Sequence, residues 1–198
     1  MESFLQSIER PAYRVALIAS RNREDALDLV QEAMCKFVEK YASRPSEEWK
    51  PLFYRILHNG VRDLSRRRKV RSCLRWIGLG ADDDRDPWEQ FEDARSPDPE
   101  HQTKVNHASR ALQKALAELP LRQQQAFLLR GWEELSVAET ATSMGCTEGS
   151  VKTHYSRAVH ALREKLGDHW PRTSRNESWW MRQKSSWISQ RRIWMGKP

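Results

Sequence analysis

The chain has 198 residues, of which 38% are hydrophobic and 31% are charged. This length allows one ordinary domain or two small ones, and so polar a composition favours two small helical cores over one large core. The apolar runs are too short for a transmembrane helix, and we expect no secretory signal at the N-terminus. Cys35, Cys73 and Cys146 are isolated and form no disulfide or metal-binding pattern, which favours a reducing compartment.

The net charge is +7, and it is distributed unevenly along the chain. Residues 1–73 hold 15 Lys or Arg against 10 Asp or Glu, whereas residues 74–100 hold three against nine. Residues 101–168 hold nine basic residues against seven acidic ones, and residues 169–198 hold seven against one. Two basic or near-neutral blocks therefore flank an acidic segment, and a basic tail follows. This pattern favours a polyanionic partner.

Apolar residues recur at helical spacing through most of the first 73 residues. A first helix is expected around residues 4–16, with Pro11 starting or kinking it. A second helix is predicted over 24–41 and a third from about residue 49 to Lys69, separated by a break at 43–46. From residue 106 the helical pattern returns, with helix ends predicted at Pro120 and near Gly131.

No segment shows the alternation of a strand, so the fold class is predicted as all-α. We predict two small helical domains at residues 1–73 and 106–168, joined by an acidic linker at 74–105. Residues 169–198 form a basic, Trp-rich tail, predicted to be disordered or an amphipathic helix. In that tail Trp180, Trp187 and Trp194 are spaced by seven residues.

The segment from Ser136 to Arg163 predicts a helix-turn-helix. Ser136 and Glu139 form a capping box, Gly145 suits a left-handed helix end, and Thr147 can cap the following helix. This second helix is predicted to expose side chains that bind phosphates and base edges; they are Ser150, Lys152, Thr153, His154, Ser156 and Arg157. The alternative is an ordinary helical hairpin with a solvated outer face.

A second candidate nucleic-acid site lies at the end of the third predicted helix. Asn59, Arg62 and Asp63 precede a run of four cations; the run is Arg66, Arg67, Arg68 and Lys69. Cations at the C-terminal end of a helix also compensate the helix dipole, so this cluster alone leaves both interpretations open. Aromatic residues just upstream can stack on unpaired bases, although core packing is the favoured role for each; they are Trp49, Phe53 and Tyr54.

Both blocks resemble bacterial RNA polymerase sigma factors of the extracytoplasmic-function (ECF) group. DALDLVQEAMCKFVEKY and WKPLFYRILHNGVRDLSRRRK, within residues 25–69, are similar to the second conserved region of that family. Residues 115–166 are similar to its fourth region, with Leu119-Pro120, Glu139, Gly145 and Arg157 at matching positions. The sequence departs from the common pattern at Phe53, Thr140 and His154.

The resemblance implies a division of labour along the chain. Asp28, Gln31 and Glu32 would dock on the clamp helices of the largest polymerase subunit, and the C-terminal domain would contact the flap of the second largest. Asn59 and the loop at 43–48 would hold a base flipped from the minus-ten element, while the following cations, with Arg62, hold phosphates. The second helix of the C-terminal domain would read the minus-thirty-five element in the major groove.

The same resemblance implies core RNA polymerase and promoter DNA as partners, with an anti-sigma factor as a further candidate partner. The acidic linker would occupy the polymerase's own nucleic-acid channel, or act as a solvated spacer. We expect a cytoplasmic protein, monomeric when free, with no small-molecule substrate, cofactor or metal.

The leading alternative is a LuxR-type regulator, because residues 150–154 (SVKTH) resemble its recognition helix. An enzyme acting on nucleic acid is disfavoured, since no paired carboxylates or His/Cys cluster suggests catalysis.

Overall fold

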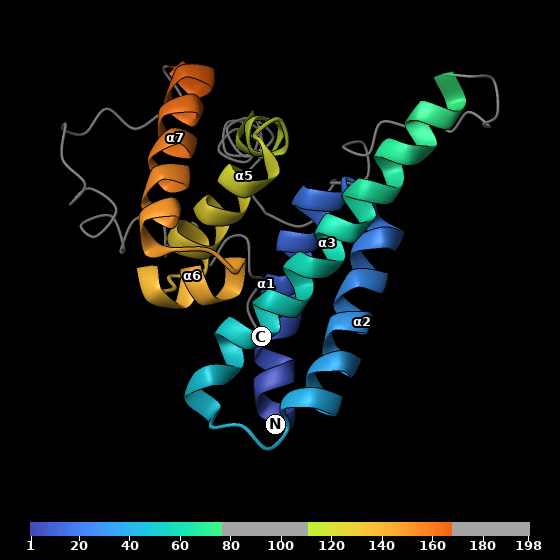
Figure 1. Cartoon of the computed structure of the whole chain (residues 1–198), viewed down its shortest axis with the longest axis vertical. Helices are drawn as coiled ribbons and strands as arrows, with labels where there is room; N and C mark the ends of the chain where they lie inside the picture. The colour runs from blue at the N-terminus through green and yellow to red at the C-terminus, as the bar shows by residue number, and fades with distance from the viewer. Residues whose placement is uncertain (77–110, 168–198) are drawn as a thin grey trace, which may run out of the picture.

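The computed structural model describes residues 1–76 and 111–167 (Figure 1). Within these two ranges the regular elements are all helical, which confirms the all-α prediction. The basic tail with its Trp stripe lies outside the described residues. So does the predicted acidic linker, except for its first three residues, because the third helix continues to Trp76.

Three helices form the N-terminal lobe, which we define as residues 1–76 (Figure 1). They are α1 (Glu2–Ser20), α2 (Arg23–Tyr41) and α3 (Ser46–Trp76). Pro11 lies inside α1, so the helix does not begin there. A proline in a helix interior costs about 3 kcal/mol. Burial of Ile8, Ala12 and Val15 on either side of it supplies stabilising apolar contact.

Aromatic side chains fill the end of the N-terminal lobe where α1 begins. The ring of Phe4 lies 5.5 Å from that of Phe37 and 5.4 Å from that of Trp49, between ring centroids. Phe53 meets Phe37 edge-on at 5.9 Å. Phe53 and Tyr54 are fully buried, and the Trp49 indole donates a hydrogen bond to the Arg44 carbonyl. These contacts bear out core packing for the aromatics.

Helices α2 and α3 approach each other closely at Gly60. A Cβ atom at this position would lie 2.9 Å from Cδ2 of Leu29, so a larger residue would force the buried leucine to move. Not every apolar residue of α2 turns inward, however. Leu27 and Val38 are 44% and 41% exposed, on the side of α2 away from the core.

The C-terminal lobe, residues 111–167, is built from short helices and one longer helix. A helical segment over 111–117 precedes α5 (Leu121–Phe127), which continues into a π-helical turn, η2 (Leu128–Trp132). Then follow α6 (Val137–Met144) and α7 (Glu148–Leu166). The helix ends predicted at Pro120 and near Gly131 agree with these bounds.

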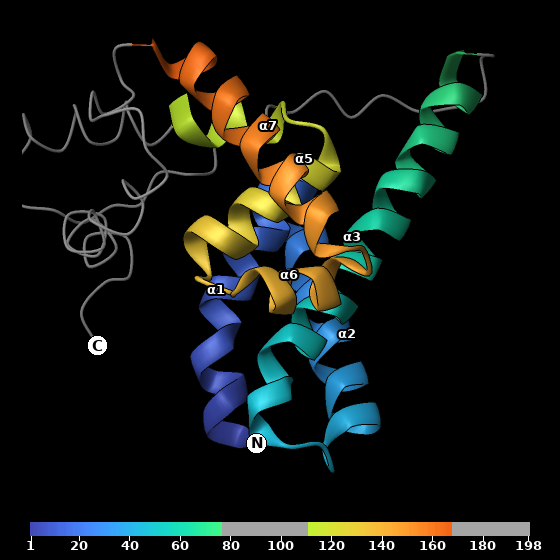
Figure 2. The same ribbon diagram turned by 60° about the vertical axis from the view of Figure 1, so that its left-hand side comes forward.

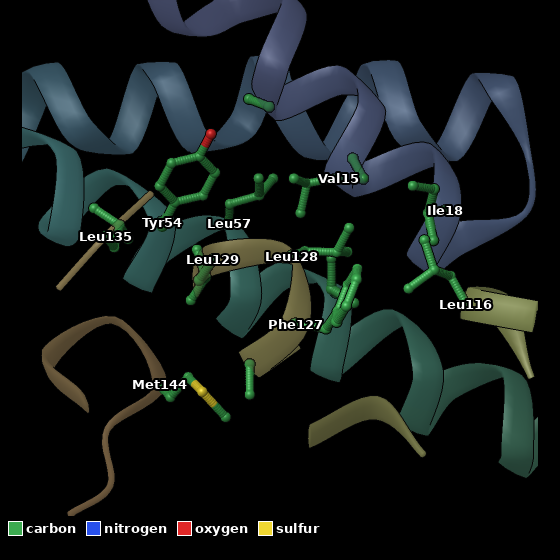
Figure 3. Packing of buried hydrophobic residues seen from close by; sticks show 14 of the residues in the cluster. Val15, Ile18, Tyr54, Leu57, Leu116, Phe127, Leu128, Leu129, Leu135 and Met144 are labelled. Atoms are coloured by element: carbon green, nitrogen blue, oxygen red, sulfur yellow. The ribbon is translucent and has the colours of Figure 1, made fainter. Parts of the chain in front are cut away.

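The two small helical domains that the sequence predicts are present as the two lobes, which pack against each other and share one hydrophobic cluster. Buried residues from both lobes form a single cluster. In it Tyr54 and Leu57 of α3 lie near Leu129 and Leu135 of the C-terminal lobe (Figure 3). Helix α6 packs against α3, and α7 lies beyond it (Figures 1 and 2). Pairing distant helices buries more apolar surface than either lobe can bury alone.

Candidate nucleic-acid interface

The outer face of α2 presents both charged and apolar side chains. Asp28, Gln31 and Glu32 are exposed there, and Glu32 forms an ion pair of 2.5 Å with Lys36 one turn later. At about 100° per residue, Leu27 and Val38 lie on the same side of the helix as Gln31. Both belong to the apolar pattern that predicts this helix, but the structure leaves them exposed. A pair of exposed apolar residues beside acidic and amide groups is typical of a protein-binding surface.

A polar face of α3 carries Asn59, which is exposed. The Arg62 guanidinium donates to the Asn59 side-chain carbonyl at 2.6 Å, and the side-chain amide nitrogen of Asn59 retains its two donors. Arg66 is exposed and pairs with Asp63 at 3.2 Å. Arg62, Arg66 and Lys69 all lie within about 80° of Asn59 around the helix, and Arg67 is exposed at the edge of this face.

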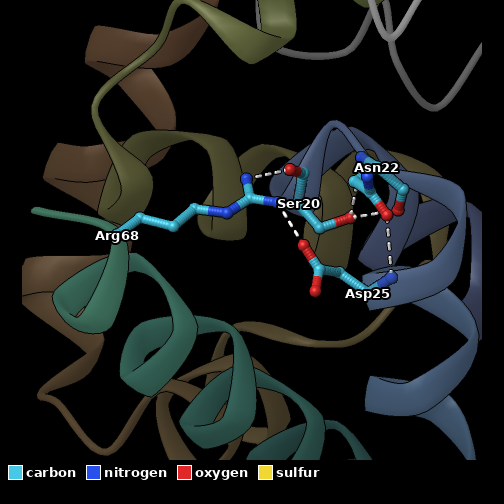
Figure 4. Close-up of polar contacts among 4 residues, drawn as sticks. All are labelled: Ser20, Asn22, Asp25 and Arg68. Carbon is cyan, nitrogen blue, oxygen red and sulfur yellow. Dashed lines mark hydrogen bonds and ion pairs between the residues drawn. The ribbon is translucent and has the colours of Figure 1, made fainter. Parts of the chain in front are cut away.

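Arg68 points away from this face. At about 100° per residue it lies half a turn from Asn59 around α3. Its guanidinium donates to the backbone carbonyl of Ser20, at the end of α1, and to the carboxylate of Asp25, in the first turn of α2 (Figure 4). The side chain is 40% exposed. The structure therefore separates Arg68 from the other residues predicted to bind phosphate, because two of its five N–H donors bind α1 and α2 on the opposite side of the helix.

The helix-turn-helix forms as the sequence predicts. The Ser136 hydroxyl accepts from the backbone N–H of Glu139, and the Glu139 carboxylate accepts from the backbone N–H of Ser136 at 2.7 Å. Hydrogen bonds from Ser136 to the carboxylate, first from its side chain and then from its backbone N–H, lower the pKa of Glu139 below its usual value. Gly145 adopts the left-handed conformation at φ 60°, and the Thr147 hydroxyl caps α7 by accepting from the backbone N–H of Ser150.

The recognition face of α7 is narrower than predicted. Lys152, Thr153, Ser156 and Arg157 are exposed, whereas two of the predicted residues are only partly exposed; these are Ser150, bonded to the cap, and His154. The ring nitrogen Nδ1 of His154 is buried without a hydrogen-bond partner among the described residues. Burial, followed by the positive charges of Arg122 and Arg157, lowers the pKa of His154.

Polar contacts join the two lobes where α3 begins. Lys50 Nζ donates to the Glu133 carbonyl at 2.7 Å and lies 3.3 Å from its carboxylate, which is only 7% exposed. The Ser143 hydroxyl donates to the Pro51 carbonyl at 3.0 Å. Burial raises the pKa of Tyr54 well above its usual value, and the charge of Glu133 raises it further.

One turn along α3 from Tyr54 lies His58, also at the contact between the lobes. Both of its ring nitrogens are buried without a hydrogen-bond partner among the described residues. Burial, followed by the positive charges of Arg122 of α5 and Arg62 of α3, lowers the pKa of His58 to about 3. The positive charge of Arg122 thus lowers the pKa of both His58 of α3 and His154 of α7.

Comparisons with known proteins match each lobe to one family. Residues 2–71 match the model of sigma-70 region 2, and residues 109–162 match that of sigma-70 region 4. An RNA polymerase sigma-E factor of Streptomyces antibioticus is 31% identical over 144 residues, 72% of this chain and 71% of the relative. RNA polymerase sigma factor SigV of Bacillus subtilis is 31% identical over 160 residues, 78% of this chain and 83% of the relative. The chain belongs to the sigma-70 family.

Other similar proteins place it in the ECF group, as the resemblance implied. ECF sigma factor SigE of Mycolicibacterium smegmatis is 33% identical over 170 residues, covering 83% of this chain and 60% of the relative. A solved structure, sigma factor RpoE with the anti-sigma factor NepR from Bartonella quintana, has the same fold. Its TM-score is 0.60 at 24% identity, covering 84% of this chain and 98% of that chain.

The chain is therefore a transcription-initiation factor that binds core RNA polymerase and directs it to promoters; it is not an enzyme. The LuxR-type alternative receives no support from these matches. In the described ranges, no helix is long and apolar enough to cross a membrane. No three His, Cys, Asp or Glu side chains gather as a metal site among the same residues.

Proposed function

We propose that three exposed helix faces divide the work of this sigma factor. The α2 face binds core polymerase, the Asn59 face of α3 captures and melts the minus-ten element, and the outer face of α7 reads the minus-thirty-five element. The observation that carries this proposal is that the faces lie on three different helices. Each presents the chemistry of its partner at the surface.

For polymerase binding, Asp28, Gln31 and Glu32 supply the polar contacts to the clamp helices of the largest subunit. The exposed side chains of Leu27 and Val38 add apolar area to the same face. The C-terminal lobe contacts the flap of the second largest subunit. These assignments combine the family resemblance with the exposure of the residues.

At the minus-ten element, Asn59 binds a flipped base. A side-chain amide both donates and accepts, which offsets part of the few kcal/mol that unstacking a base costs. The side chains of Arg62, Arg66, Arg67 and Lys69 hold the flanking phosphates. Residues 1–73, together with the rest of α3, form the domain that recognises and melts the minus-ten element.

At the minus-thirty-five element, α7 enters the major groove. Lys152 and Arg157 are long enough to reach phosphates or guanine edges, and Thr153 and Ser156 supply hydroxyls. His154 and Ser150, predicted as base contacts, lie at the border of this face and complete it when the lobe binds DNA. Residues 106–168 form the domain that recognises the minus-thirty-five element.

The two lobes separate when both elements are bound. The elements lie about 25 base pairs apart, or roughly 85 Å along B-form DNA. In this structure α3, which carries Asn59, instead packs against α6, which in turn packs against α7, and α7 itself is only about 28 Å long. The packed arrangement therefore belongs to the free protein.

We assign this sigma factor to the cytoplasm, and we propose an anti-sigma partner by analogy with the RpoE complex.

A pair of variants tests this division of labour. Gln31→Ala is expected to weaken binding to core polymerase about tenfold, because it removes a contact at the centre of the α2 face. Asn59→Ala should leave core binding unchanged and lower thymine reactivity to permanganate in the melted promoter. Fluorescence polarisation measures the first effect and footprinting the second. Equal losses in both assays for both variants would contradict separate faces.

A further inference from the structure

Residues 65–70 of α3 have few polar side-chain ties to the rest of the N-terminal lobe. Val61 is buried, whereas Val70, less than three turns later, is 56% exposed. Between residues 65 and 70, Arg68 is the one side chain with a hydrogen bond or ion pair to another described helix. Figure 1 shows this end of α3 extending past α1 and α2. In this part of α3, Arg68 is therefore the side chain that ties the basic cluster to α1 and α2.

The group that Arg68 holds is itself a rigid corner between α1 and α2. The Ser20 hydroxyl donates to the Asn22 carbonyl at 2.9 Å and accepts from the Asn22 backbone N–H at 3.3 Å. The Asn22 side chain in turn caps α2 by accepting from the backbone N–H of Asp25 at 2.9 Å. Arg21 completes the turn in the left-handed conformation, at φ 55°. These bonds fix the carbonyl and the carboxylate that Arg68 binds (Figure 4).

We propose that Arg68 is a positioning residue for promoter opening and not a ligand of DNA phosphate. It sets the orientation of the DNA-facing end of α3 relative to α2, the helix assigned to polymerase binding. The planar guanidinium suits this role because one side chain reaches two acceptors at a fixed angle. This inference rests on the proposed function of both helix faces.

The experiment compares Arg68→Ala with Arg67→Ala, its exposed neighbour on the same turn, in the reconstituted holoenzyme. Arg68→Ala is expected to slow open-complex formation about five- to tenfold. It should leave the salt dependence of promoter binding unchanged, since no phosphate contact is lost. Arg67→Ala should instead reduce the salt slope by about one. Core binding should stay unchanged for both variants.

Two further variants separate positioning from charge. Arg68→Lys keeps the positive charge but cannot bridge both acceptors, so it is expected to open promoters as slowly as Arg68→Ala. The double variant Arg68→Asp with Asp25→Arg restores an ion pair with its charges exchanged. It should recover only part of the opening rate, because the Ser20 carbonyl stays without its donor, and this recovery cannot come from a phosphate contact, since an aspartate at position 68 does not bind phosphate. Should Arg68→Ala fail to fold by circular dichroism, these two variants carry the same comparison.

Two results would overturn the proposal while the proposed function stands. One is a salt slope reduced by about one in Arg68→Ala and restored in Arg68→Lys, which would make Arg68 a phosphate ligand. The other is a normal opening rate in Arg68→Ala. If Arg67→Ala and Asn59→Ala also left promoter binding and opening unchanged, the DNA-facing assignment of α3 would be wrong. The positioning role of Arg68 would then be wrong as well, because it depends on that assignment.

Discussion

His58 shows at the residue scale how the contact between the lobes responds to protons. Its ring is buried beside Tyr54, with Arg122 and Arg62 as the nearest positive charges. The native pKa of about 3 lies below the ordinary value of 6.5, so the unfolded chain takes up a proton first as the pH falls. Stability is therefore unaffected above pH 6.5 and decreases below it, until the pH reaches about 3.

We predict that this histidine costs about 1.4 kcal/mol of unfolding free energy at pH 5.5 relative to pH 7.5. His58→Leu should remove that loss, because leucine does not titrate and leaves no ring nitrogen unpaired. Urea unfolding of both proteins at the two pH values measures the difference. Since the His154 pKa is also lowered, only the change between wild type and variant reports on His58. Identical pH dependence in both would contradict a neutral, buried His58.

Among the elements, the helix-turn-helix depends on a short helix, α6, of eight residues. So short a helix is not stable alone, and its ends are fixed by the capping box and by Gly145. Arg122 also donates to the Met144 carbonyl at 2.6 Å, which ties the end of α6 to α5. These local bonds orient α7 for DNA.

Ser136→Ala is predicted to lower the free energy of unfolding by about 1 kcal/mol, because the backbone N–H of Glu139 loses its acceptor. Ser156→Ala, on the exposed face of α7, is the matched control and should change stability by less than about 0.5 kcal/mol. Chemical denaturation followed by circular dichroism compares them. Equal destabilisation by the two substitutions would show that the cap contributes nothing specific.

Much of the helical architecture could be predicted from the sequence, because capping and turn signals are local. The box at Ser136 and Glu139 and the left-handed Gly145 were found by residue type and spacing alone. The direction of Arg68 could also be predicted from the sequence. Nine residues after Asn59 are two and a half helical turns, which places Arg68 on the opposite side of α3. Four adjacent cations look like one cluster in the sequence. On a helix they point to different sides, so only some of them face the same partner.

Other features depend on tertiary packing and have no local signal. The contact of α3 with α6 joins residues about 90 positions apart, such as Pro51 and Ser143, so neither segment alone specifies it. The exposure of Leu27 and Val38 likewise follows from which face of α2 the other helices cover. The resemblance to sigma factors identifies the two conserved regions of the sequence. It does not predict how the two lobes pack against each other, which only the structure shows.

For the whole molecule, the shared core predicts a large change of shape on promoter binding. A Cys-free chain with dyes at positions 47 and 164, both exposed, reports the distance between the lobes. Energy transfer is expected to fall sharply when core polymerase and promoter DNA are both present. A control pair at positions 9 and 47, within the N-terminal lobe, should stay constant. Unchanged transfer between the lobes would contradict their separation.

The most direct test of the central claim is transcription in vitro from genomic DNA of the source organism. Core polymerase with and without this chain is compared by sequencing the 5′ ends of the transcripts. The account predicts defined start sites only with the chain present, preceded by two shared sequence blocks about 25 base pairs apart. It also predicts that Asn59→Ala weakens these starts. Starts that do not depend on the chain, or that share no upstream blocks, would contradict promoter recognition by its two lobes.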